Sequence, residues 1–98
     1  MTINKSQNGD TLVISLEGRL DTVTAPELEA ELKNSLEAVN SLVLNFSSLD
    51  YISSAGLRVL LSAHKAMSKK GGLKITNANE VVKEVFDVTG FADILTIE

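Results

Sequence analysis

The 98-residue chain has no cysteine and no tryptophan, and it has only one histidine and one proline. Without cysteine it has no disulfide framework, no thiolate metal site and no cysteine nucleophile. The single histidine, His64, excludes zinc sites that are built from several histidines. We therefore expect neither a metal ion nor another cofactor.

Basic and aromatic residues are also scarce. Nine Lys and Arg stand against thirteen Asp and Glu, which gives a net charge of −4, and only one Tyr and three Phe are present. Nucleic-acid-binding domains carry a basic patch and often stack bases on aromatic side chains. We therefore expect no nucleic-acid partner.

Long hydrophobic runs are absent as well. The apolar stretches are a few residues long, far short of the ~20 that a membrane-spanning helix needs. The first ten residues, MTINKSQNGD, contain no apolar segment typical of a signal peptide. We expect no membrane insertion, a cytoplasmic location and a single domain over residues 1–98.

The first half of the chain predicts two strands and a helix. Residues 3–7 and 11–17 are predicted strands, separated by the turn signal Asn8-Gly9-Asp10 and ended at Gly18. Thr24 is a predicted N-cap that forms a capping box with Glu27. The helix that follows has its apolar residues at helical spacing, namely Leu28, Leu32, Leu36 and Val39.

The second half continues the alternation. The apolar run 42–46 is typical of a central strand covered on both faces, and residues 47–54 read as a polar loop. A helix is predicted from Ala55 to the Lys69-Lys70 pair, where Gly71-Gly72 stops it. A strand at 73–76, a helix from Asn79 to Gly90 and a last short strand within 91–97 follow. This order predicts an α/β fold with a mixed, mostly parallel sheet and alternating helices packed on it.

In open α/β sheets, partner and ligand sites gather at the carboxyl ends of strands and at the helix N-termini beside them. The segment Ser53-Ser54-Ala55-Gly56 lies at such a place. A serine there either caps the helix or carries a modification. A phosphate would meet unpaired N–H groups and add about two negative charges to the surface.

An enzyme is not expected, and we predict no catalytic residue. The segment Ser53-Ser54-Ala55-Gly56 lacks the first glycine of a nucleophile elbow. His64 lies about 15 Å further along the predicted helix, beyond the reach of a general base for Ser54. A phosphocarrier would place its histidine at a helix start, whereas His64 is in mid-helix. The carboxylates of Asp21 and Asp50 either flank the same loop or serve only as turn or cap residues.

Three blocks of the sequence resemble one known family. Residues 49–61, LDYISSAGLRVLL, closely resemble the signature of STAS domains of the anti-sigma factor antagonist type. Residues 16–21, LEGRLD, with Thr24-Ala25 after them, and residues 85–91, VFDVTGF, resemble two further blocks of the family. The spacing of the blocks is that of a minimal one-domain STAS protein, and the resemblance covers nearly the whole chain.

The resemblance implies a regulatory switch. A family member of this type binds a partner anti-sigma factor, usually an ATP-dependent serine kinase, and thereby frees a sigma factor for transcription. The kinase phosphorylates a serine at the start of the second helix, which breaks the complex, and a protein phosphatase restores it. Such proteins are often monomeric when free.

The resemblance also implies site residues. The family pattern Asp-Ser-Ser/Thr-Gly, aligned on Gly56, places the phosphate acceptor on Ser54. The chain departs from this pattern, with Ser53 in place of the acid and Ala55 in place of the second hydroxyl residue, so Ser53 is a second possible acceptor. The implied partner surface comprises Asp21, Thr22, Val23, Thr24, Asp50, Tyr51, Ile52, Ser53, Ser54, Gly56 and Leu57. An alternative function is that of a non-phosphorylated STAS accessory subunit of a lipid or anion transport system.

Overall fold

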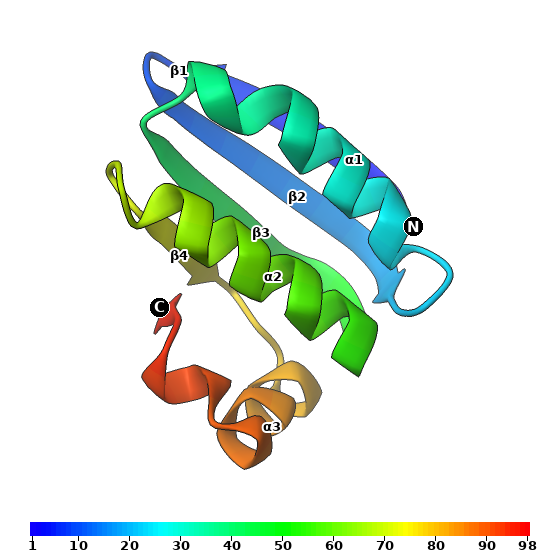
Figure 1. Cartoon of the computed structure of the whole chain (residues 1–98). Helices are drawn as coiled ribbons and strands as arrows, with labels where there is room; N and C mark the ends of the chain where they lie inside the picture. The colour runs from blue at the N-terminus through cyan, green and yellow to red at the C-terminus, as the bar shows by residue number, and fades with distance from the viewer.

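The computed structural model describes all 98 residues, which form a five-stranded mixed sheet and three α-helices (Figure 1). The elements in chain order are β1 (Thr2–Asn8), β2 (Thr11–Leu20), α1 (Ala25–Ser35), the 3₁₀ turn η1 (Leu36–Ala38), β3 (Ser41–Ile52), α2 (Ser54–Met67), β4 (Leu73–Thr76), α3 (Glu80–Thr89), the 3₁₀ turn η2 (Phe91–Asp93) and β5 (Thr96–Ile97). The strands lie side by side in sequence order. Only β1 is antiparallel to its neighbour, so the predicted mostly parallel sheet is confirmed.

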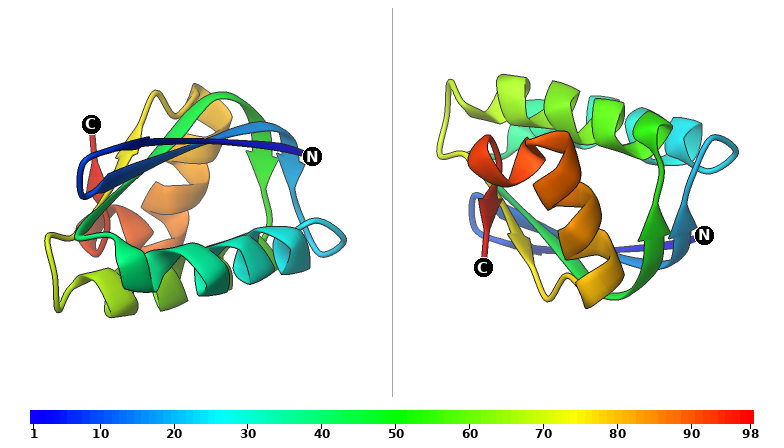
Figure 2. Two further views of the ribbon diagram at one scale, coloured as in Figure 1. Left: turned by 90° about the horizontal axis from the view of Figure 1, so that it is seen from above. Right: turned by 90° about the horizontal axis from the view of Figure 1, so that it is seen from below.

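The helices cover one face of the sheet (Figure 2). In residues 11–16 of β2 and 41–46 of β3 every second side chain is buried, while Val43 and Asn45 on the other face are only half-buried. The prediction that residues 42–46 are covered on both faces is therefore wrong. Because each parallel strand follows the previous one in space without a reversal, right-handed crossovers place every helix on the same side.

Strand β3 is longer than predicted. Residues 47–52, expected as a polar loop, continue the strand, because Leu49 and Ile52 still point into the core. The predicted break at Gly18 is also wrong, since β2 runs on to Leu20. Register shifts between β2 and β3 accommodate both extensions. As a result, Ser53 alone separates β3 from α2.

The core is one cluster of 24 buried apolar residues with no buried polar side chain. Helix α3 contributes Val82 and Phe86, both fully buried. The Asn79 side chain accepts a hydrogen bond from the Val82 N–H (2.8 Å), and its amide donates to the carbonyl oxygen of Leu49 (3.0 Å). The predicted N-cap at Asn79 is thus confirmed, and it also attaches the start of α3 to β3.

The end of α2 is attached to the end of α1. The Lys70 ammonium donates hydrogen bonds to the carbonyl oxygens of Leu36 (2.7 Å) and Val39 (3.0 Å). The basic pair at 69–70 was predicted to complement the C-terminus of its own helix. Lys70 instead donates to carbonyl groups at the end of α1 and η1, of which that of Leu36 also accepts a long hydrogen bond from the Val39 N–H (3.5 Å). None of the helices is long and apolar enough to cross a membrane.

Candidate functional site

The residues of the predicted site gather where β2 and β3 end and α1 and α2 begin, at the right-hand end of the molecule in Figure 1. Leu20 and Ile52 are neighbours in the sheet. The Ser53 N–H donates to the carbonyl oxygen of Leu20 (2.9 Å), which joins the two connections. Residues 21–24 and 50–57, distant in the sequence, therefore form one region of the surface.

Hydrogen bonds within residues 19–24 hold the loop between β2 and α1. The Asp21 carboxylate accepts from the backbone N–H groups of Val23 (3.0 Å) and Thr24 (3.1 Å). The Thr24 hydroxyl accepts from the Asp21 N–H (2.9 Å) and donates to the Arg19 carbonyl oxygen (2.7 Å). The predicted capping box with Glu27 is absent, because the Thr24 hydroxyl binds the backbone of Arg19 and Asp21 and caps no N–H group of α1. The loop presents Val23, whose side chain is 81% exposed.

The same hydrogen bonds change the acidity of Asp21. The N–H of Thr24, followed by that of Val23, stabilises the charged carboxylate, and the Arg19 guanidinium adds to the effect. The pKa of Asp21 therefore lies below its ordinary value of 3.8, although partial loss of solvent acts in the opposite direction. Asp21 is a carboxylate throughout the neutral pH range.

We expect the contribution of Asp21 to stability to depend on pH in a defined direction. Because its pKa is lower in the folded chain than in the unfolded chain, the carboxylate stabilises the fold above pH 3.8. This stabilisation is lost as the pH falls from 3.8 through the folded pKa. Carboxyl-carbon NMR titration of Asp21 measures the shift directly, and the stability difference between wild type and Asp21→Asn should shrink over the same interval. A midpoint for Asp21 at or above 3.8 would contradict this expectation.

Arg19 is a part of the site that the sequence interpretation missed. Its guanidinium carbon lies 4.6 Å from the centroid of the Tyr51 ring, and its Nε lies 3.7 Å from the Asp21 Oδ2. The cation–π contact and the ion pair connect the end of β3 to the loop after β2. In the sequence, Arg19 stands two residues before Asp21, and this position alone does not indicate a role in the site. The role becomes visible only when the strand register places Arg19 opposite Tyr51.

The two serines have different environments. Ser53 is the N-cap of α2, and its side chain accepts from the Gly56 N–H at 3.5 Å. Ser54 is the first residue of α2, is exposed, and its hydroxyl has no hydrogen-bond partner. The capping role and the free hydroxyl thus fall on adjacent residues. Unpaired N–H groups and the positive end of the helix dipole surround Ser54.

The remaining predicted residues divide by exposure. Ile52 and Leu57 are 1% and 5% exposed, and Gly56 is buried, so these three residues lie in the packing beneath the surface. The exposed residues are Thr22, Val23, Asp50 and Ser54, and the half-buried ones are Asp21, Thr24, Tyr51 and Ser53. We call these eight residues the loop surface.

The other polar features do not join the loop surface. His64 is half-buried in the later part of α2, ten residues after Ser54, as predicted. No group of three or more His, Cys, Asp or Glu side chains is placed to hold a metal ion.

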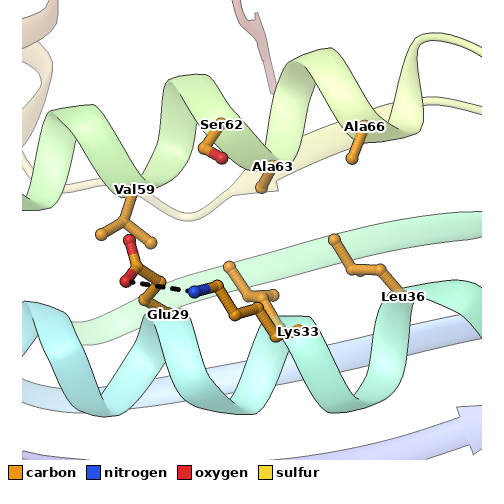
Figure 3. Close-up of a pocket in the computed structure, with 8 residues that line it drawn as sticks. Glu29, Lys33, Leu36, Val59, Ser62, Ala63 and Ala66 are labelled. Atoms are coloured by element: carbon orange, nitrogen blue, oxygen red, sulfur yellow. Dashed lines mark ion pairs between the residues drawn. The ribbon is translucent and has the colours of Figure 1, made fainter.

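A groove of about 170 Å³ lies between α1 and α2, with the Glu29–Lys33 ion pair (3.8 Å) at its rim and Val59 and Ala63 among its lining residues (Figure 3). No residue of the loop surface lines this groove.

Comparison with known proteins shows similarity along the whole chain. The STAS domain family model matches residues 2–98. The anti-sigma-B factor antagonist of Bacillus subtilis is 31% identical over 98 residues, which cover 99% of this chain and 90% of that protein. The anti-sigma F factor antagonist of Paenibacillus polymyxa is 25% identical over 100 residues, which cover 99% of this chain and 86% of that protein.

Solved structures show the same fold. The anti-sigma factor antagonist SpoIIAA in its unphosphorylated form superposes with a TM-score of 0.84 at 22% identity, covering 99% of this chain and 88% of that chain. The Bacillus cell fate determinant SpoIIAA in its phosphorylated form superposes with a TM-score of 0.76 at 21% identity, covering 99% and 91%.

Proposed function

This chain belongs to the STAS domain family as an anti-sigma factor antagonist, and we propose that it binds a partner anti-sigma factor through the loop surface and thereby releases a sigma factor. The observation that carries the proposal is the 31% identity to an anti-sigma-B factor antagonist across 99% of the chain. The loop surface suits docking because it is held by internal hydrogen bonds and presents the exposed apolar side chain of Val23.

The regulation proposed is phosphorylation of Ser54 by the partner, acting as a serine kinase, and its reversal by a phosphatase. One observation favours Ser54 over Ser53, and a second supports phosphorylation in this fold. The Ser54 hydroxyl is exposed and free of hydrogen bonds, whereas the Ser53 side chain caps α2. SpoIIAA, which shares the fold, has been described in unphosphorylated and phosphorylated forms.

Electrostatics explains how a phosphate would separate the partners. In the free protein, the phosphate of Ser54 would lie at the positive end of α2, where solvent and N–H groups stabilise it. In the complex, the same group would be desolvated and would lie on a surface that already carries Asp21 and Asp50. The phosphate therefore weakens the complex while it leaves the free fold intact.

We predict that Ser54→Asp lowers the affinity for the partner about tenfold to a hundredfold, because the added negative charge must be desolvated in the complex. This range corresponds to about 1.4–2.8 kcal/mol of lost binding free energy, since each 1.4 kcal/mol changes affinity tenfold. Ser54→Ala should bind like wild type and accept no phosphate. Wild type, Ser54→Asp and Ser54→Ala serve as three baits in native lysate, and quantitative mass spectrometry compares how much partner each bait recovers. Mass spectrometry of the wild-type protein itself should place phosphate on Ser54.

Ser53→Ala is the matched control. It should lose about 1 kcal/mol of stability through the missing cap but keep phosphorylation at Ser54. Equal recovery of one kinase-like protein by wild type and Ser54→Asp would contradict the switch. Recovery of the same transporter subunit by all baits would instead show a constitutive assembly module, with no role for phosphate.

A further inference from the structure

Helix α3 carries an apolar stripe that the fold covers only in its middle. Val81 and Val88 are 52% and 78% exposed, and Val85 between them is half-buried. These three residues are spaced at i, i+4 and i+7, so they line one face of the helix. We call them the α3 stripe. The buried face of α3, formed by Val82 and Phe86, lies beside the stripe, and Val85 at the border also packs against the core.

An acidic stripe runs beside the apolar one. Glu80, Glu84 and Asp87 repeat the same spacing, each one residue before a valine of the α3 stripe. All three side chains are exposed, and none of them takes part in an ion pair. With Asp93 and the single base Lys83, residues 80–94 carry a net charge of −3, most of the −4 of the whole chain.

The exposed valines and the acids beyond the first turn bring the isolated domain little benefit. Valine is a weaker helix former than alanine or leucine, and on an exposed helix face it buries little surface in return. The three carboxylates at i, i+4 and i+7 repel one another, with Lys83 as the one base on the helix, and the positive end of the helix dipole favours only Glu80 in the first turn. Both costs are removed when one partner covers the valines and brings positive charge to the carboxylates.

We propose that α3 is a second docking surface, which binds a cationic amphipathic helix of a partner protein. Such a helix would lay an apolar stripe on Val81, Val85 and Val88 and set Lys or Arg against Glu80, Glu84 and Asp87. The charges select this occupant, because a second copy of the chain would bring a second acidic stripe to the interface. The surface lies on a different element from the loop surface and does not depend on phosphorylation.

The test uses the full ¹⁵N-labelled chain and two synthetic helical peptides. Both peptides have leucines at i, i+4 and i+7. One has lysines beside the leucines, and the other has glutamates there. We expect the lysine peptide to shift amide resonances of residues 80–94 and to bind about tenfold or more tightly than the glutamate peptide, since several exposed charge pairs contribute together.

Two valines of nearly equal exposure make matched variants. Val88→Ser on α3 should lose the binding of the lysine peptide, whereas Val23→Ser, at 81% exposure on the loop surface, should keep it. Replacing Glu84 by Gln and Asp87 by Asn should weaken the binding of the lysine peptide and leave only the attraction of Glu80 in this stripe. Equal binding of the two peptides, or resonance shifts outside residues 80–94, would overturn the proposal. Dimerisation through α3 without peptide would also overturn it, because a second copy would then be the occupant.

Discussion

Replacing Phe86 by alanine should lower the free energy of unfolding by about 3–5 kcal/mol, a large part of the stability of a domain of this size. Phe86 is fully buried, and together with Val82 it is the apolar attachment of α3 to the core. Its loss leaves a cavity that the short helix cannot close, because Asn79 holds the start of α3 on Leu49 and Gly90 ends the helix. Urea unfolding followed by circular dichroism measures the change.

Two further variants separate burial from helix propensity. Phe86→Leu keeps most of the buried volume and should cost about 1.5 kcal/mol or less. Val88→Ser, on the exposed side of the same helix, should change the stability by no more than about 0.5 kcal/mol. If Phe86→Ala unfolds at nearly the urea concentration of wild type, α3 is not part of the cooperative core.

The order of the elements could be predicted from the sequence because it rests on strong local signals. The alternation Leu12, Ile14 and Leu16 defines β2, and the cap at Asn79 with the stop at Gly90 bounds α3. These signals depend on side chains within a few residues of one another. They predict element type and order well, and the confirmed mixed sheet follows from that order.

The extensions of β2 and β3 could not be predicted in this way. Ser47, Ser48 and Asp50 are turn-forming residues, yet they lie on a strand. Ser48 pairs with Glu17 of β2, whereas Ser47 and Asp50 lie at the two register shifts and have no partner residue in β2. The register shifts that allow this are properties of the pair of strands and are invisible in either strand alone. The same limit applies to Arg19, whose contact with Tyr51 exists only across the sheet.

The division of roles between Ser53 and Ser54 also needed the structure. In the sequence both serines are equal candidates for a helix cap, and the family resemblance alone favoured Ser54. The end of β3 at Ile52 decides which serine becomes the N-cap, and the other is then left exposed on the first turn. If β3 ended one residue later, Ser54 would be the N-cap, and Ala55 would take the exposed first position of the helix.

Replacing Gly56 by alanine should destabilise the protein by about 2–3 kcal/mol, the reverse of the usual gain of such a change in a helix. An added Cβ would lie 2.7 Å from Cγ of Leu20 and 2.9 Å from Cγ1 of Ile52. Both neighbours are almost fully buried, and these two atoms are not the flexible ends of their side chains. The helix α2 must therefore shift away from the ends of β2 and β3. Thermal unfolding measures the loss, with Ser62→Ala on the exposed side of α2 as a control that should gain about 0.5 kcal/mol.

A double-mutant cycle tests whether the clash is the cause. Leu20→Ala alone should cost about 2–5 kcal/mol through the cavity that it leaves. In the double variant with Gly56→Ala the new methyl group occupies part of that cavity, so the combined loss should be smaller than the sum of the two single losses. Additive losses would mean that the methyl group does not meet Leu20.

Because Gly56 lies in the first turn of α2, the shifted helix also moves Ser54 relative to the loop that carries Val23. Gly56→Ala should therefore weaken partner binding even where the variant remains folded, which ties the geometry of the loop surface to one close contact in the core.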